Sequence, residues 1–225
     1  MKLAIAIDGP SGAGKSTLAR ALAQRCGFLY VDTGAMYRAV GLYALEHGAD
    51  PKDGEAVQAL LPDIHLALRY EDGEQHILLN GRDVTRDVRR EDVGMAASGV
   101  SAHPPVRAFL LETQRRLARE NSVVMDGRDI GTVVLPDAEI KIFLTAAPEE
   151  RARRRCEQLR EQGQDADYDE VLRDVRRRDE NDTTRAVSPL RQAEDAVLVD
   201  TTGNTFEQSL ARLSALIDEK REGLR

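Results

Sequence analysis

The stretch GPSGAGKS, residues Gly9 to Ser16, restricts the possible folds of this chain more than any other feature. It matches the pattern GxxxxGK[ST] and lies between an apolar run, Leu3–Ile7, and a segment with helical spacing that begins at Lys15. The glycines leave successive backbone N–H groups free to wrap a phosphate, and the following helix adds its positive end. The pattern therefore predicts a strand, a phosphate-binding loop and a helix in direct succession.

This loop is expected to bind a nucleoside triphosphate. Lys15 should reach the β- and γ-phosphates, and the hydroxyl of Ser16 should ligate Mg²⁺. The residues predicted to contact the triphosphate here are Gly9, Pro10, Ser11, Gly12, Ala13, Gly14, Lys15, Ser16 and Thr17. ATPases, GTPases and kinases all carry such a loop, so the loop alone does not select a reaction.

The rest of the chain repeats the alternation of strand and helix. Short apolar runs predict buried strands over residues 28–32, 122–125, 139–145 and 196–200. Helical spacing predicts helices over residues 35–48, 90–101, 104–121, 148–162, 168–182 and 205–220. Together with the first strand, this order predicts an α/β fold: a five-stranded parallel sheet with helices on both faces.

One segment departs from this alternation. Between Pro62 and Arg90, apolar and polar residues alternate around the turn signals Asp72-Gly73 and Asn80-Gly81. The segment is therefore predicted to be a small antiparallel meander inserted into the α/β domain.

The charge balance and the cysteines exclude several classes of protein. The 225 residues include 32 basic and 39 acidic side chains, a net charge of −7, which gives no support for binding to a nucleic-acid polymer or an anionic membrane. No apolar run approaches the ~18 residues of a membrane-spanning helix. Cys26 and Cys156 lie far apart and outside any metal-ligand spacing. We expect a single-domain, monomeric cytoplasmic protein.

Polar side chains that follow the predicted strands distinguish a kinase from a hydrolase. A kinase must hold a second substrate, and two approaching phosphoryl groups need fixed cations around them. Candidates after two strands, where ligands of open α/β sheets bind, and on three predicted helices are Thr33, Tyr37, Arg38, Arg107, Asp126, Arg128, Asp129, Arg178, Asp182 and Arg185. Asp126 could either cap the end of its strand or hold Mg²⁺ through water.

Four motifs, taken in order, resemble bacterial cytidylate kinases: IDGPSGAGKST, DTGAMYR, DGRDIGTVVLPDAEIKIFL and RRRDENDTTRAVSPL. The resemblance covers nearly the whole chain. It implies transfer of the γ-phosphoryl group of ATP to CMP or dCMP, with Mg²⁺ as cofactor. It also implies one kinase domain with a core of residues 1–60 and 94–225, a monophosphate-binding insert of about 62–93 and a short helical lid of about 151–168. The lid could bring Arg151, Arg154 or Arg155 over the phosphates, and Arg154 is taken as the ATP-binding one.

The same resemblance implies roles for the acceptor side. Around the monophosphate or the transferred phosphoryl group it places Thr33, Tyr37, Arg38, Arg128, Arg178 and Arg185, with Lys15, Arg128 and Arg178 as catalytic residues. Ser98, Arg107 and Asp129 would read cytosine, and Asp182 would meet a sugar hydroxyl. Thr33 stands where the family often has Ser.

The choice of Asp129 as a base reader also has a physical reason. Cytosine presents a donor at N4 and an acceptor at N3, which suit a carboxylate and an arginine. Uracil presents an oxygen at position 4, so the same carboxylate would face an unpaired acceptor, at a cost of several kcal/mol.

Two alternatives stay open at this stage. One is a kinase for another small acceptor, such as a different nucleotide or a hydroxylated metabolite. The other is an ATPase or regulatory nucleotide-binding module that uses its arginine-rich helix to touch RNA, although aromatic residues are not interleaved along that helix. A panel of acceptors would separate these from a cytidylate kinase.

Overall fold

The computed structural model describes residues 2–71, 74–161 and 163–223, and its centre is a parallel sheet. The five strands follow the order β2-β6-β1-β7-β8. Their bounds are Ala4–Asp8 for β1, Leu29–Asp32 for β2, Val123–Gly127 for β6, Ile140–Thr145 for β7 and Val197–Asp200 for β8. The predicted α/β fold is confirmed, and each predicted strand agrees to within two residues at either end.

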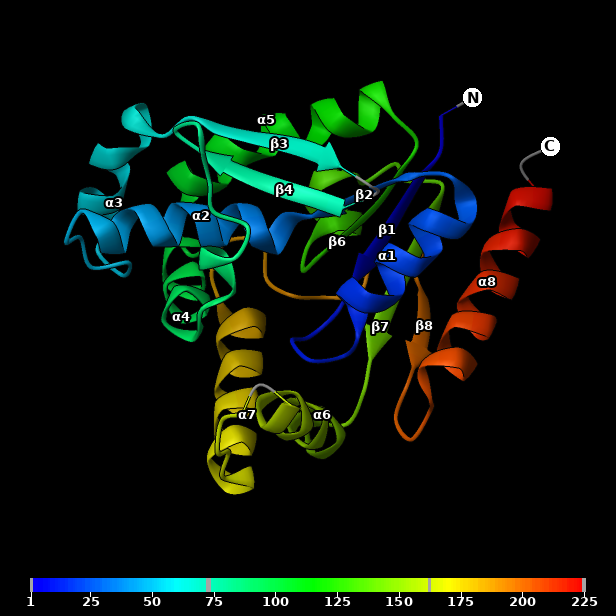
Figure 1. The fold of residues 1–225 in the computed structure, drawn as a ribbon. Coiled ribbons are helices and arrows are strands. Elements are labelled where there is room, and N and C mark those ends of the chain that lie inside the picture. Colours follow the sequence, from blue (N-terminus) through cyan, green and yellow to red (C-terminus); the bar gives the residue numbers. More distant parts are fainter. Residues whose placement is uncertain (1, 72–73, 162, 224–225) are drawn as a thin grey trace.

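Helices cover both faces of this sheet (Figure 1). Successive residues of a strand point to opposite sides, and here the side chains on both sides are apolar and must be buried. Ile5 and Ile7 face α1 (Lys15–Cys26) and α8 (Phe206–Glu222). Ala6 faces the other side, which is covered by α5 (Pro104–Glu120) and a short helical turn, Ile130–Val134. Gly27 closes α1 in the left-handed conformation, and Thr205 with Gln208 forms the capping box that begins α8.

Helix α2 (Thr33–Glu46) starts two residues earlier than its spacing predicts. The Asp32 carboxylate accepts a hydrogen bond from the Ala35 N–H at 2.9 Å and so caps the helix directly at the end of β2. Helix α4 (Glu91–Val100) packs closely on α2, since a Cβ at Gly41 would lie only 2.9 Å from the Ala97 nitrogen. Thr33 therefore lies in the first turn of a helix rather than in a loop.

The inserted meander is confirmed as a three-stranded antiparallel sheet in the order β3-β4-β5. Its strands span Leu66–Glu71, Glu74–Leu79 and Arg82–Asp83. The Asn80-Gly81 turn has the positive φ angles of a tight hairpin turn, whereas Asp72-Gly73 lies outside the described residues. Gln75 of β4 exchanges hydrogen bonds with the Asp32 backbone at 2.9 and 3.3 Å, which anchors the insert to the end of β2.

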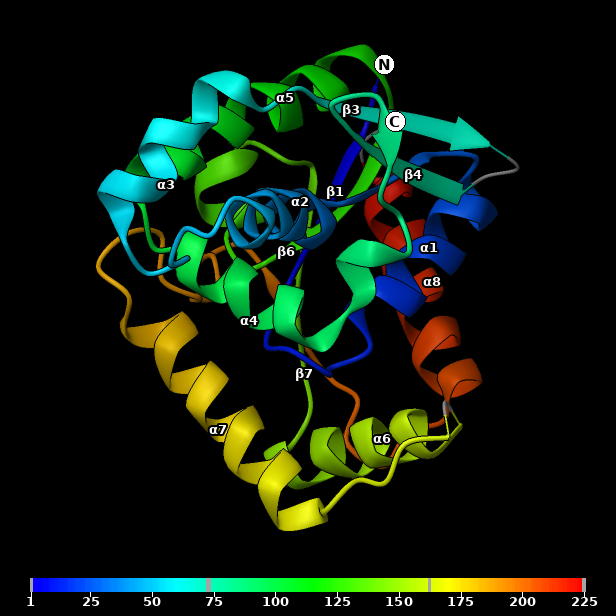
Figure 2. The same ribbon diagram turned by 60° about the vertical axis from the view of Figure 1, so that its left-hand side comes forward.

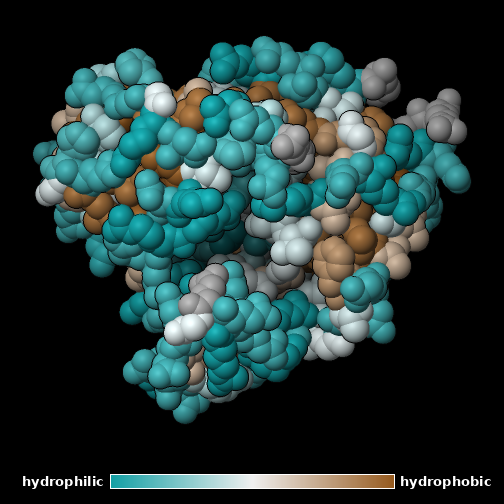
Figure 3. Space-filling model, in the orientation of Figure 1, coloured by the Kyte–Doolittle hydropathy of each residue, from teal (hydrophilic) through white to brown (hydrophobic). Residues whose placement is uncertain are grey.

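Helices α6 (Pro148–Glu161) and α7 (Tyr168–Thr184) form a lobe beyond the carboxyl ends of the central strands (Figures 1 and 2). Figure 3 shows that the visible face of this lobe is mostly hydrophilic. Helix α7 runs two residues past its predicted end. A further helix, α3 (Gly54–Leu60), was not predicted; Asp53 caps it by accepting hydrogen bonds from two backbone N–H groups. Among the described helices, none is long and apolar enough to cross a membrane.

Candidate active site

The phosphate loop joins β1 to α1 in a conformation that depends on glycine. Gly9 has φ of +149°, and a Cβ there would lie 1.9 Å from the Leu144 carbonyl oxygen. Gly14, at φ of +87°, leads directly into α1. No side chain fits at Gly9. The loop lies at the positive end of a twelve-residue helix, where backbone N–H groups can bind a phosphate.

Lys15 is nearly buried behind this loop and donates to the Pro10 carbonyl at 2.7 Å. Burial lowers the pKa of Lys15 to about 7, and the positive charge of Arg128 acts in the same direction. Lys15 comes from the loop and Arg128 from the far end of β6, so two distant segments place cations close together. A polyphosphate bound between Lys15 and Arg128 would offset both the burial of the Lys15 charge and the repulsion between the two cations.

Ser16 and Asp126 provide oxygen atoms beside the loop. Ser16 Oγ donates to Asp126 Oδ2 at 2.9 Å, and the Tyr30 hydroxyl donates to Asp126 Oδ1 at 3.0 Å. Burial, together with the nearby Asp32 carboxylate, raises the pKa of Asp126 to about 6. Mg²⁺ typically binds one or two protein oxygens along with nucleotide phosphates. A hydroxyl and a buried carboxylate whose negative charge is not fully balanced by nearby cations suit it. These donors fit the metal, and Asp126 contacts side chains rather than capping its strand.

On the other side of the sheet end, Arg107 and Asp129 form a buried pair. Arg107 Nη2 donates to Asp129 Oδ2, and its Nη1 donates to the Ser101 carbonyl at 3.1 Å. Both side chains are less than 10% exposed, and the guanidinium lies 5.4 Å from the centre of the Tyr37 ring. Ser98 is linked only indirectly, since its carbonyl accepts from the Ser101 hydroxyl at 3.0 Å. The structure thus brings Tyr37, Arg107 and Asp129 into one cluster.

Arg128 and Arg185 lie near that pair, and Arg178 lies near Arg128. Arg128 Nε donates to Asp182 Oδ2 at 2.7 Å. Arg185 Nε donates to the Ser188 carbonyl at 2.7 Å, and Arg178 Nη2 lies 3.3 Å from the Met95 sulfur. Arg185 Nη2 and Arg178 Nε are buried, with no hydrogen-bond partner among the described residues.

The electrostatics of these arginines favour an anion. Burial lowers the pKa values of Arg178 and Arg185, and a neighbouring cation adds to the effect in each case, Arg155 for Arg178 and Arg107 for Arg185. A guanidinium stays protonated, so burying it near another cation costs free energy. A bound anion would offset that cost. We call this group the acceptor cluster; its members are Tyr37, Arg107, Arg128, Asp129, Arg178, Asp182 and Arg185.

Two other predicted residues lie between the loop and the acceptor cluster. Burial lowers the pKa of Arg38, although the Asp32 carboxylate opposes this shift. The Thr33 hydroxyl donates to the Asp126 carbonyl at 2.7 Å. To donate to a phosphate oxygen, this hydroxyl would have to rotate away from β6.

The three candidate lid arginines point in different directions. Arg151 uses its guanidinium on protein groups, including the Ser11 carbonyl. Arg154 Nη2 donates to the Thr201 carbonyl at 2.7 Å, and its Nη1 lies 4.0 Å from the Cβ position of Gly14. Arg155 Nη1 donates to Gln158 at 3.0 Å. Of the three, Arg154 is thus the one whose guanidinium lies beside Gly14, at the start of α1.

Two residues that connect different segments around the site, Asp8 and Arg89, were not predicted. Asp8 accepts hydrogen bonds from the Ile130 and Gly131 N–H groups at 2.7 Å each, and burial raises its pKa to about 6. Arg89 forms an ion pair with Asp32 at 3.1 Å, between the segment after the insert and the end of β2. Asp8 ends a strand beside the loop, a position that could have marked it. Nothing in the sequence distinguishes Arg89 from the other arginines.

Comparison with known proteins decides the family. A protein-family profile described as cytidylate kinase matches residues 5–219. The chain belongs to the cytidylate kinase family. It is 52% identical to the cytidylate kinase of Carboxydothermus hydrogenoformans over 98% of this chain and 99% of that protein. It is 47% identical to the cytidylate kinase of Caldicellulosiruptor bescii over 96% of this chain and 95% of that protein.

A solved structure also shares the fold of this cytidylate kinase family member. The crystal structure of an uncharacterized protein from Eubacterium ventriosum has a TM-score of 0.51 and 14% identity, with 96% of this chain and 99% of that chain covered. At this identity the likeness shows the arrangement of the sheet and helices alone.

Proposed function

We propose that this enzyme transfers the γ-phosphoryl group of ATP to CMP or dCMP, giving ADP and CDP or dCDP. The observation that carries the proposal is the buried pair of Arg107 and Asp129 beside a cluster of arginines. A guanidinium and a carboxylate held side by side match the acceptor N3 and the donor N4 of cytosine. Family membership supports the same acceptor.

In this proposal the phosphate loop holds the donor. Residues 9–17 would wrap the triphosphate of ATP, with Lys15 on the β- and γ-phosphates and Arg154 beside them. Ser16, with Asp126 through water, would hold Mg²⁺, which supplies neutralisation of charge on the phosphates. We propose the lid of about 151–168 and the insert of about 62–93 as the parts that enclose the two substrates.

The acceptor cluster would orient the monophosphate. Arg178, Arg185 and Arg38 would face it; all three side chains are partly buried, and burial lowers their pKa values. Arg128 lies near Lys15 and would stabilise the transferred group between the substrates. A phosphate oxygen that attacks is already ionised near neutral pH, so no general base is required. Catalysis would come from alignment and neutralisation of charge.

An ATP-coupled assay across CMP, dCMP, UMP, AMP and GMP tests the proposal. The expected result is the highest kcat/KM with CMP or dCMP, and CDP or dCDP as the product. UMP as a better acceptor than both would overturn it in favour of another nucleotide kinase. ATP hydrolysis without transfer to any monophosphate would favour an ATPase.

A further inference from the structure

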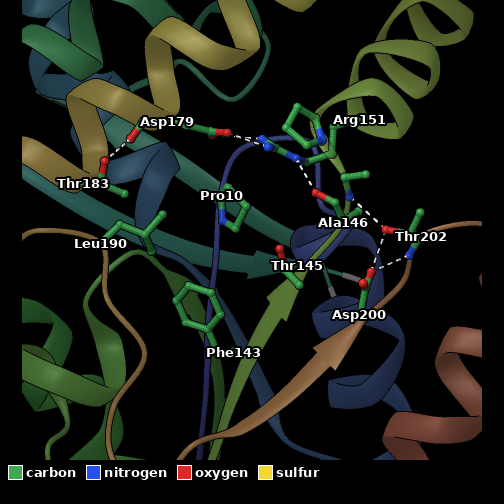
Figure 4. Close-up of a pocket in the computed structure, with 12 residues that line it drawn as sticks. Pro10, Phe143, Thr145, Ala146, Arg151, Asp179, Thr183, Leu190, Asp200 and Thr202 are labelled. Atoms are coloured by element: carbon green, nitrogen blue, oxygen red, sulfur yellow. Dashed lines mark hydrogen bonds and ion pairs between the residues drawn. The ribbon is translucent and has the colours of Figure 1, made fainter.

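A buried arginine at the start of α6 joins three separate segments. Arg151 is 3% exposed, and its Nη1 donates to the Ser11 carbonyl at 3.0 Å and to Asp179 Oδ1 at 2.9 Å. Its Nη2 donates to the other Asp179 oxygen, and its Nε donates to the Ala146 carbonyl at 2.9 Å (Figure 4). One guanidinium therefore connects the phosphate loop, the end of β7 and helix α7.

The contact with the phosphate loop extends to packing. The Cβ of Arg151 lies 3.3 Å from the position of a Cβ at Gly12, which has φ of +78°. The side chain thus lies directly against the loop that wraps the triphosphate. A shift of this loop would change both this packing contact and the hydrogen bond from Arg151 Nη1 to the Ser11 carbonyl.

Asp179 passes this connection to the acceptor cluster. It neighbours Arg178 in α7, and Asp182 follows three residues later on the same helix. Asp182 in turn holds Arg128, with 2.7 Å between Asp182 Oδ2 and Arg128 Nε. A continuous series of hydrogen bonds and one rigid helix therefore runs from Ser11 to the arginine that faces Lys15.

A second ion pair links the same two helices without touching the loop. Arg176 Nη2 of α7 lies 2.7 Å from Glu149 Oε1 of α6, and these side chains are 60% and 54% exposed. The Asp179 side chain is 26% exposed and its partner is buried. Exposed pairs contribute little, whereas a bidentate buried pair fixes its partners in one geometry. Both pairs attach α6 to α7, but only the Arg151–Asp179 pair also contacts the phosphate loop. Variants of the two pairs can therefore distinguish attachment of the helices from coupling to the loop.

We propose that Arg151 and Asp179 are a positioning pair that couples occupancy of the phosphate loop to the placement of α7 and its acceptor-binding side chains. Neither residue touches the reacting atoms; they act through Ser11 on one side and Asp182 with Arg128 on the other. The inference rests on the proposed function for the identity of the acceptor. Its thermodynamic content is that a bound donor raises the affinity for the acceptor, and the reverse by the same factor.

The test is calorimetric binding of CMP to the full chain, with and without a non-hydrolysable ATP analogue and Mg²⁺. In the unaltered protein the analogue is expected to raise CMP affinity by about fivefold or more. In Asp179→Asn, and independently in Arg151→Lys, the factor should fall below about twofold, while the affinity for each ligand alone changes little. Arg176→Gln, the matched control, should keep the full factor.

Two further variants test whether the loss of coupling comes from this pair. The double variant should lose no more coupling than either single one, because both remove the same connection. Asp179→Glu keeps the carboxylate and should restore part of the coupling. Equal coupling in the unaltered protein and in Asp179→Asn would overturn the proposal, as would a loss of coupling in Arg176→Gln that matches the loss in Asp179→Asn. If the acceptor panel identifies another monophosphate, the proposed function fails and the coupling test proceeds unchanged with that acceptor.

Discussion

The donor end and the acceptor end of this site are built in different ways. The donor end is one continuous loop, residues 9–16, whose shape depends on glycine φ angles and whose binding groups are mostly backbone N–H. The acceptor cluster consists of side chains from α2, α5, the segment after β6, and α7 with the residue that follows it. A local backbone motif is robust to changes elsewhere, whereas the acceptor cluster depends on how four parts of the chain pack.

The two ends also differ in how their charges are balanced. In the acceptor cluster, Arg107 is paired with Asp129 and Arg128 with Asp182. These pairs keep the cations in place, and in the proposed complex Arg107 with Asp129 would contact the base and Asp182 the sugar. At the donor end, the Lys15 ammonium group donates to the Pro10 carbonyl and to no other group in the described part of the chain. Variants at each end should therefore affect different kinetic constants.

The largest effect is expected at the donor end. Lys15→Ala removes the cation that we propose faces the transferred phosphoryl group, and it should lower kcat by about 10³-fold. The affinity for CMP alone, measured by calorimetry, should stay close to that of the unaltered protein. A kcat within a factor of about ten would contradict the placement of Lys15 on the donor phosphates.

A change at the acceptor end should act on the acceptor alone. Arg185→Ala removes a partly buried guanidinium whose buried Nη2 has no partner among the described residues. Loss of a charged hydrogen bond should raise KM for CMP by about 30-fold and leave KM for ATP nearly unchanged. Steady-state kinetics with each substrate varied in turn would check this. Equal increases in both KM values would show that the two ends do not act separately.

Base selectivity should depend on the charge of one side chain. Asp129→Asn keeps the shape but presents an amide that can donate to the oxygen of uracil, so the preference for CMP over UMP should fall about tenfold. The ratio of the two kcat/KM values measures the effect. Asp182→Asn is the matched comparison on the sugar side and should leave this ratio unchanged. A selectivity that survives in Asp129→Asn would place base reading on other residues.

The smallest effect on catalysis is expected at Asp8, the last residue of β1. Its carboxylate accepts hydrogen bonds from the Ile130 and Gly131 N–H groups, in the segment after β6. Burial raises its pKa from 3.8 to about 6, so the folded state binds the proton more tightly than the unfolded chain. Its contribution to stability is therefore fully present below pH 3.8 and lost as the pH rises through 6.

Asp8→Asn removes this titration. The free energy of unfolding of the unaltered protein relative to the variant should fall by on the order of 2 kcal/mol between pH 4 and pH 7. Urea unfolding at several pH values measures this difference. Parallel stability curves for the two proteins would show that Asp8 does not titrate in this range.

Most of the fold could be predicted because its signals are local. Apolar runs, glycine turns and helix caps give the five core strands and the helices on both faces. The exceptions have physical causes: α3 is only seven residues long, and α2 starts early because the Asp32 side chain caps it at the strand end. The candidate site residues followed from motifs at strand ends and on helices, and Ser98 from the family resemblance alone. Their roles remain predictions.

The sequence by itself determined the phosphate loop, the order of strands and helices, and which residue types gather after each strand, since each depends on neighbours a few residues apart. Only the tertiary structure decided that Arg107 pairs with Asp129, that Arg128 pairs with Asp182, and that Arg151 turns toward Ser11 and Asp179. The reason is that a chain with 32 basic and 39 acidic residues allows many pairings. Packing selects among them by the depth at which each charge is buried and by which carboxylate lies within reach.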